Sequence, residues 1–471
     1  MLHVSTRGEA PALSFSDALL TGLARDGGLY LPQSWPTLDK AEIAGFAGQP
    51  YATVAERILG ALSDGDVEPQ ALGRMIHEAY ATFRHPAVCP LTQIGDNLFV
   101  LELFHGPTLA FKDVAMQLLG RLMDHVLGQR GQRATIVGAT SGDTGGAAID
   151  AFKGLKSVDV FILYPQGRVS DVQRRQMTTV DADNVHAIAV EGTFDDCQNL
   201  VKAMFNHHAF RDEIGLSGVN SINWARIAAQ VVYYFTAAVS LGGPGRKVSF
   251  AVPTGNFGDI LAGWVAKRMG LPIERLTIAT NSNDILTRTL SSGVYEMRGV
   301  AATTSPSMDI QISSNFERLL FEAHERDGAA VRRLMQSLQQ SGRFELAPEP
   351  LARIRSEFDA TALSEAEVAA EIRETWNESG YLADPHTAIG IGAARQKLAR
   401  DPATPMVVLG TAHPAKFPAA VKAACDVEPA LPAHLADLME RKERVTELPN
   451  DLAAVEKFVR EHARAVRGAA A

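Results

Sequence analysis

The feature that most constrains the fold is a repeated unit, in which a short apolar run leads into a glycine-rich loop and then into a helical pattern. Three such units begin with the apolar runs at residues 133–138, 247–252 and 405–409, and a further apolar run at 159–164 follows the first helix. Continuously apolar strands that alternate with helices are typical of a parallel sheet covered on both faces. The sequence therefore predicts an α/β protein with a largely parallel sheet.

A chain of 471 residues is too long for one simple core, so we expect more than one domain. Changes in the sequence pattern predict where the domain boundaries lie. The first eighty or so residues are helix-rich, and a proline-bounded break follows them. Ala-rich and charge-rich segments indicate helices in two later regions. We expect an N-terminal domain at 1–85, an α/β core at 86–430 with a helical insertion at about 291–378, and a helical tail at 431–471.

Composition argues against several classes of partner. The 45 basic and 54 acidic residues give a net charge of −9 without a basic stripe, so nucleic acid is not expected to bind. We find neither a secretory signal nor an apolar run near the roughly 20 residues of a membrane helix. Three scattered cysteines predict no disulfide framework and no metal site, which fits a reducing cytoplasm.

Lys112 stands at the start of an amphipathic helical pattern, with apolar residues at 109–111 and 114–116 on either side. A lysine in such a place is ordinarily solvated. An apolar collar would instead lower the pKa of its amine and make the neutral form accessible near pH 7. A neutral amine is what Schiff-base formation requires. The residues alone leave both interpretations open.

Two glycine-rich loops, at 138–146 and 253–259, each follow a predicted strand and open a helix. Backbone N–H groups in such loops can face an anion, and the helix dipole favours a phosphate dianion. Either loop could be a plain turn, but two of them suggest a phosphorylated cofactor and a carboxylate-bearing substrate. Neither has the spacing of a Walker loop or a dinucleotide fingerprint, which argues against an ATPase or a dehydrogenase.

Ser221, Asn223 and Arg226 lie close together before a helical pattern at 227–239. An arginine can bind a phosphate through two hydrogen bonds, and the neighbouring amide and hydroxyl would add neutral donors. Alternatively, Asn223 caps the helix and Arg226 is solvated.

Two further polar segments lie where a ligand could bind. Thr411 and His413 follow a predicted strand, and ligands in such sheets bind at the carboxyl ends of strands. Either residue could simply end the strand. Residues 384–387 precede a helix and could act as its cap.

Together these segments resemble the threonine synthases, a branch of the fold-type II pyridoxal-phosphate enzymes. The resemblance spans most of the chain, and the segment around Lys112 matches the cofactor-attachment signature of that family. Seven motifs occur in family order, at residues 25–32, 105–113, 139–145, 220–226, 255–259, 384–387 and 411–417. The resemblance implies two open, twisted, mostly parallel sheet domains, a small N-terminal domain, and a helical insertion and C-terminal extension.

The resemblance also implies roles for individual residues. Lys112 holds pyridoxal 5'-phosphate as a Schiff base and moves protons at Cα and Cβ of the substrate. The implied cofactor contacts are Lys112, Phe111, Asp143, the phosphate loop Gly255, Asn256, Phe257, Gly258 and Asp259, and Thr411 at the pyridine nitrogen. The implied substrate contacts are Ser141, Gly142 and Thr144 for the carboxylate, and Ser221, Asn223 and Arg226 for the phosphate. Relatives often carry Asn at the position of Asp143, where the cofactor's ring hydroxyl is contacted.

The implied reaction converts O-phospho-L-homoserine and water into L-threonine and phosphate by γ-elimination and β-hydration, as the last step of threonine biosynthesis. One alternative is a threonine-synthase-like phospho-lyase that yields a 2-oxo acid. Another is a serine or threonine dehydratase or a β-replacing synthase, which the phosphate-binding set disfavours. A non-catalytic sensor is disfavoured by Lys112. We expect a monomer, with a homodimer as the alternative.

Overall fold

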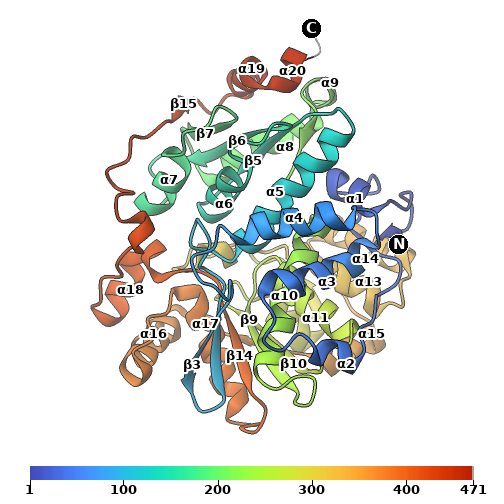
Figure 1. Ribbon diagram of the computed structural model, residues 1–471, viewed down its shortest axis with the longest axis vertical. Helices are drawn as coiled ribbons and strands as arrows, with labels where there is room; N and C mark the ends of the chain where they lie inside the picture. The colour runs from blue at the N-terminus through green and yellow to red at the C-terminus, as the bar shows by residue number, and fades with distance from the viewer. Residues whose placement is uncertain (469–471) are drawn as a thin grey trace.

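Two sheets organise the protein, whose computed structural model describes residues 1–468 (Figure 1). The larger sheet, in the lower half of Figure 1, has the order β13 (Phe358–Ala362), β10 (Ile273–Thr280), β9 (Val248–Pro253), β14 (Met406–Gly410), β4 (Leu98–Glu102) and β3 (Leu91–Gly95). The smaller sheet, in the upper half, has the order β15 (Thr446–Leu448), β7 (Val185–Val190), β6 (Val158–Pro165), β5 (Ala134–Ala139) and β8 (Leu216–Ser217). All neighbouring strands are parallel except β3 and β4. The predicted fold class is confirmed.

The predicted strands correspond to β5, β6, β9 and β14. Every residue of β6, β9 and β14 is buried, which explains why their sequences are continuously apolar instead of alternating. The helices that pack around the smaller sheet are α6 (Asp143–Phe152), α7 (Asp171–Thr178), α8 (Phe194–Asn206) and α9 (His208–Glu213). Those near the larger sheet include α12 (Ile285–Ser292), α16 (Glu365–Ser379), α17 (Pro385–Leu398), η2 (Pro414–Lys416) and α18 (Pro418–Cys425).

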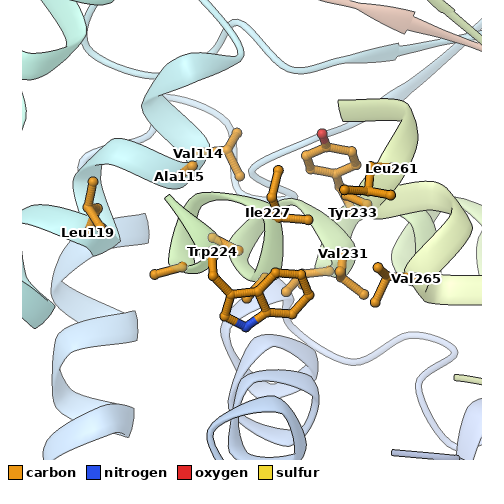
Figure 2. Packing of buried hydrophobic residues seen from close by; sticks show 14 of the residues in the cluster. Val114, Ala115, Leu119, Trp224, Ile227, Val231, Tyr233, Leu261 and Val265 are labelled. Atoms are coloured by element: carbon orange, nitrogen blue, oxygen red, sulfur yellow. The ribbon is translucent and has the colours of Figure 1, made fainter. Parts of the chain in front are cut away.

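Three helices share one buried core and carry the candidate site at their N-terminal ends. They are α5 (Lys112–Gln129), α10 (Trp224–Ser240) and α11 (Gly258–Arg268). Figure 2 shows the side chains that pack between them: Val114, Ala115 and Leu119 from α5, Trp224, Ile227, Val231 and Tyr233 from α10, and Leu261 and Val265 from α11. This packing holds the first turns of the three helices in a fixed relation to one another.

The N-terminal segment packs against the same helices. It contains β1 (His3–Ser5), α1 (Phe15–Thr21), β2 (Tyr30–Pro32), α2 (Lys40–Ala44), α3 (Tyr51–Ser63) and α4 (Pro69–Tyr80). Helix α3 packs on α10, and α4 packs on α5. The predicted helix-rich character is confirmed, with one small antiparallel pair, β1 and β2, added to it.

The insertion at about 291–378 is not purely helical, so that prediction is wrong in part. It contains η1 (Pro306–Met308), α13 (Phe316–Ala323), α14 (Gly328–Ser341), α15 (Pro348–Glu357) and α16, and also β11 (Val294–Glu296), β12 (Arg343–Glu345) and β13. Strands β11 and β12 form an antiparallel pair in which the rings of Tyr295 and Phe344 stack 4.7 Å apart, and β13 forms an edge of the larger sheet. Strands of three to five residues are too short to show a period in the sequence.

The tail at 431–471 is likewise not purely helical. It comprises η3 (Ala433–Leu435), β15, α19 (Leu452–His462) and α20 (Arg464–Gly468). Strand β15 pairs with β7 and extends the smaller sheet, so the helical prediction for the tail is corrected here too. Within residues 1–468, no helix has the length and apolar character needed to cross a membrane.

Candidate active site

Lys112 is the first residue of α5, and 7% of it is exposed. Its Nζ lies 3.3 Å from Asp143 Oδ2, 3.4 Å from Ser307 Oγ and 5.0 Å from the centre of the Phe111 ring. Burial lowers the pKa of the Lys112 amine, while the Asp143 carboxylate acts in the opposite direction. The predicted burial of the Lys112 amine is confirmed. Its surroundings are not entirely apolar, because a carboxylate and a hydroxyl also lie beside it.

The loop before Lys112 is pinned to the segment that follows β14. Phe111 N donates to Thr411 O at 2.8 Å, and Leu109 O accepts from the N–H of residue 413 at 3.0 Å. The Asp113 carboxylate accepts from Thr108 N at 2.7 Å and from Thr108 Oγ1 at 2.6 Å. Burial raises the pKa of Asp113 to about 7. These contacts fix where α5 begins and therefore where the amine points.

The first glycine-rich loop joins β5 to α6. Thr140 Oγ1 accepts from Gly142 N at 3.0 Å and from Gly145 N at 2.9 Å, which shapes the turn. The N-cap residue of α6 is Gly142, which has no side chain, and Thr140 engages only the third N–H of the helix, so the N–H groups of Asp143 and Thr144 remain available to an anion. The half-buried Ser141 and Thr144 flank this helix start.

The second glycine-rich loop joins β9 to α11, whose N-terminus also lacks a side-chain cap within the described part of the chain. Phe257 adopts a left-handed backbone with φ of 63°, and its ring packs in the core near Phe316. The Asp259 carboxylate accepts from the hydroxyls of Tyr233 and Tyr234, and burial raises its pKa to about 7. Two of the three side chains in the loop, those of Phe257 and Asp259, thus pack in the core, so the backbone N–H groups are the donors best placed for an anion.

A polar segment at 303–315, which the sequence pattern predicted only as part of the insertion, packs against both Lys112 and the second loop. Ser307 Oγ lies beside Lys112, and Ser313 Oγ donates to Gly255 O at 2.7 Å. Asn315 Nδ2 donates to Asn256 O at 2.9 Å and to the backbone oxygen of residue 221 at 3.1 Å. The clustering of Ser, Thr and Asn between two helices was the one feature of the sequence that could have marked this segment as part of the site.

Arg226 lies in the first turn of α10, and 4% of it is exposed. Its Nη1 donates to Val219 O at 3.0 Å, and its buried Nε has no partner within residues 1–468. Burial lowers the pKa of the guanidinium to about 10, and no carboxylate in the described chain pairs with it. The alternative of a solvated arginine is therefore wrong.

Asn223 caps α10, as the alternative interpretation of that residue predicted. Its Oδ1 accepts from Ala225 N at 3.0 Å, and its Nδ2 donates to Leu19 O at 2.8 Å. Both polar atoms of this amide are engaged by the fold, whereas Ser221 is half-buried beside the loop.

Thr411 follows β14 at the carboxyl edge of the larger sheet. Its backbone N–H donates to Thr387 Oγ1 at 3.2 Å. Thr411 Oγ1 is buried and has no hydrogen-bond partner among residues 1–468. A buried hydroxyl without a partner is unfavourable, so Thr411 Oγ1 is free to form a hydrogen bond with a ligand bound at this sheet edge.

Asp384 and His386 form a buried pair next to the polar segment. Asp384 caps α17, and its Oδ2 lies 2.7 Å from His386 Nδ1. His386 Nε2 accepts from Ser307 N at 3.4 Å, which places the ring proton on Nδ1. The pair therefore helps to position Ser307 against Lys112.

Three features of this site fit pyridoxal phosphate: a buried amine at Lys112 and, as far as residues 1–468 show, an uncapped helix start at Gly258 and a Thr411 hydroxyl without a hydrogen-bond partner. Fold and site thus define a pyridoxal-phosphate-dependent enzyme of fold type II, and residues 86–411 match the family model "Pyridoxal-phosphate dependent enzyme". Residues 2–80 match "Threonine synthase N terminus", and residues 387–459 match "Threonine synthase, C-terminal". The chain belongs to the threonine synthase family.

Similar proteins agree over nearly the whole length. The chain is 54% identical over 463 residues to the threonine synthase of Pseudomonas aeruginosa, with 98% of each protein covered. The structure of PLP-bound threonine synthase from Brucella melitensis matches with 66% identity and a TM-score of 0.97, over 98% of this chain and 100% of the other. The yeast threonine synthase structure matches with 42% identity and a TM-score of 0.94, over 98% of each chain. Human "Threonine synthase-like 2" is 35% identical, over 95% of this chain and 93% of the other.

Proposed function

We propose that the protein converts O-phospho-L-homoserine and water into L-threonine and inorganic phosphate. The observation that carries this substrate is Arg226, a buried guanidinium that has no carboxylate partner within residues 1–468. Lys112 and Arg226 lie in the first turns of α5 and α10, two helices that pack against each other, so both groups belong to the same end of this helix pair. A substrate that carries a phosphate near its reacting carbons can place the phosphate against Arg226 and those carbons near Lys112. A serine-like substrate has no phosphate and leaves the charge of Arg226 unpaired.

The remaining contacts follow from the two helix starts. We assign the substrate carboxylate to Ser141, Gly142 and Thr144 at the start of α6, and its phosphate to Ser221 and Arg226. Because the amide of Asn223 is already engaged, its part in phosphate binding is to hold the first turn of α10, and with it Arg226, in place.

The cofactor would be held by the helix start at residues 255–259, by Thr411 at its ring nitrogen and by Asp143 near its ring hydroxyl. Phe111, whose ring lies beside the amine, would complete the contacts. When bound, the cofactor supplies an electron sink for the charge that develops at Cα of the substrate. A neutral hydroxyl at the ring nitrogen, in place of a carboxylate, favours an unprotonated ring.

Lys112 performs the proton transfers of the proposed reaction. Its Nζ removes one proton from Cα and then one from Cβ, and phosphate leaves from Cγ with the electrons of the C–O bond. Nζ then returns protons to Cγ and Cα, while water adds its oxygen at Cβ. The proton that the water loses leaves with the phosphate, so substrate and water account for every atom of threonine and phosphate.

The position of the added oxygen tests this function. Purified protein is incubated with O-phospho-L-homoserine in ¹⁸O-labelled water, and both products are identified by mass spectrometry. We expect equal amounts of threonine and phosphate, with the label on the threonine hydroxyl and none in the phosphate. A 2-oxo acid with phosphate would instead support the phospho-lyase alternative. Homoserine with labelled phosphate would mean simple phosphate-ester hydrolysis.

Gly255→Ala tests the proposed cofactor-phosphate loop. A Cβ at this position would lie 2.8 Å from Ser307 O, a backbone atom, so the loop and the polar segment would have to move apart. We expect the affinity for pyridoxal phosphate to fall about tenfold or more, a loss near 1.4 kcal/mol. Absorbance titration of cofactor-free protein measures it.

Gly60→Ala provides the control for Gly255→Ala. A Cβ at Gly60, in α3, would meet no atom within 4 Å. Its affinity for the cofactor should match that of the unmodified protein. If Gly255→Ala also binds normally, the loop does not hold the phosphate.

The protein is further proposed to act as a monomer in the cytoplasm. All three cysteines are free, and two of them, Cys89 and Cys197, are buried, which is compatible with a reducing compartment. Sedimentation equilibrium at micromolar concentration should give the mass of one chain, and twice that mass would establish the homodimer.

A further inference from the structure

A second buried lysine, Lys416, shares the carboxylate that lies beside Lys112. Lys416 Nζ lies 2.9 Å from Asp143 Oδ1, while Lys112 Nζ lies 3.3 Å from the other oxygen, Oδ2. The side chain of Lys416 is 0% exposed and comes from η2, directly after the Thr411 segment. Neither the reaction steps nor the ligand contacts described above use this lysine.

The contacts of Lys416 fix its position. Besides Asp143, its Nζ donates to Thr108 O at 2.7 Å and to Gln176 Oε1 at 3.1 Å. Three acceptors match the three donors of an ammonium group, so Lys416 is fully satisfied as a cation. It is held as a permanent partner of Asp143, whereas Lys112 makes only long contacts.

Asp143 is equally well held. Gln173 Nε2 donates to Oδ1 at 3.0 Å, and Ser307 Oγ lies 3.3 Å from Oδ2. Burial alone would raise the pKa of this carboxyl, but the charges of Lys416 and then Lys112 hold it well below its usual range. The carboxyl is therefore ionised in the core and needs a compensating cation.

This carboxylate creates a conflict for Lys112. A single buried carboxylate next to a lysine favours the protonated amine, which cannot form a Schiff base. The charge of Lys416 acts in the opposite direction and lowers the pKa of the Lys112 amine. The charged or titratable groups that face this arrangement come from five elements: Asp143 on α6, Lys416 on η2, Arg226 on α10, His386 on α17 and Asp113 on α5.

We propose that Lys416 is a positioning residue that compensates the charge of Asp143 and so leaves the amine of Lys112 free to lose its proton and react with the cofactor aldehyde. In that condensation, Lys112 Nζ forms a C=N bond to the aldehyde carbon, and the aldehyde oxygen leaves as water with two protons from the amine. The inference rests on the proposed function only in that Lys112 is the attachment lysine.

The test measures the pH dependence of cofactor attachment. Full-length protein is freed of cofactor, pyridoxal phosphate is added, and the rate of the absorbance change is recorded across pH. Lys416→Met should move the midpoint of this profile upward by about one pH unit or more, so that attachment near pH 7 slows about tenfold. Lys416→Arg keeps the charge and should stay near the unmodified midpoint.

A double-mutant cycle separates charge compensation from packing. Asp143→Asn leaves Lys416 uncompensated and should move the midpoint downward, whereas Asp143→Asn/Lys416→Met removes both charges and should return it close to the unmodified value. Loss of packing alone would not give shifts of opposite sign. Near-UV circular dichroism checks the fold, and the double variant keeps the test valid if Lys416→Met folds poorly.

Two results would overturn the proposal: an unchanged midpoint in Lys416→Met, or a midpoint in the double variant no higher than in Asp143→Asn. Both readouts are independent of substrate turnover. If the protein made a product other than threonine, the proposed function would fail while these shifts remained. If the shifts were absent and threonine was formed, only the role of Lys416 would fail.

Discussion

Replacing Lys112 with alanine is expected to abolish turnover of O-phospho-L-homoserine while the protein stays folded. The amine is both the attachment point of the cofactor and the group that moves protons, and the two losses together should lower kcat by about 10⁴-fold or more. Folding should persist because Asp143 keeps Lys416 as its partner 2.9 Å away. The variant should bind pyridoxal phosphate weakly and lack the visible absorbance of the attached cofactor.

The Lys112→Ala experiment combines kinetics with chemical trapping. Borohydride reduction of the unmodified holoenzyme followed by peptide mapping should place the cofactor on Lys112 alone. Lys153→Ala is the matched control, because Lys153 lies at the end of α6 with 48% of its side chain exposed, and its turnover should stay within about twofold. Turnover of Lys112→Ala within tenfold of the unmodified enzyme would remove the central assignment.

The sequence could predict those parts of the fold and site that depend on neighbouring residues. Strands β5, β6, β9 and β14 are continuously apolar because they are buried on both faces, and their positions were predicted correctly. Each glycine-rich loop lies between one such strand and a helix, so the sequence also predicted that both loops lie at the carboxyl ends of the strands. The segment around Lys112 has a specific enough pattern to indicate the family.

Contacts between distant segments could not be predicted in this way. Ser307 lies 195 positions from Lys112, and nothing in its own segment indicates that the two meet. The pairing of Lys416 with Asp143 likewise depends on how η2 packs against α7, which in turn packs against α6. For Asn223, the choice between a helix cap and a ligand contact was settled by Leu19 O, which is 204 positions away.

Replacing Arg226 with methionine is expected to raise KM for O-phospho-L-homoserine by about 10²-fold or more, with a smaller effect on cofactor content. Each charge-assisted hydrogen bond from a buried guanidinium contributes roughly 1.5–3 kcal/mol, and an arginine can direct two of them to one phosphate. Since about 1.4 kcal/mol corresponds to a tenfold change, losing both bonds accounts for this range. Steady-state kinetics and the ratio of bound cofactor to protein separate the two effects.

The same substitution should stabilise the ligand-free protein, and this distinguishes a binding role from a structural one. Arg226 makes one hydrogen bond, to Val219 O, within residues 1–468, so its buried charge is poorly compensated until an anion binds. Arg226→Met should therefore raise Tm by roughly 2 °C or more, and added phosphate should stabilise the unmodified protein but not the variant.

Arg318→Met is the matched control, because Arg318 is also buried but donates to Tyr30 O, Ile222 O and Asn315 Oδ1. Its removal leaves three acceptors without their donor, so this variant should lower Tm. The same change from arginine to methionine should therefore lower Tm where the guanidinium stabilises the fold and raise Tm where it serves to bind a ligand. If Arg226→Met also lowers Tm, or loses cofactor while KM stays unchanged, Arg226 does not bind the substrate phosphate.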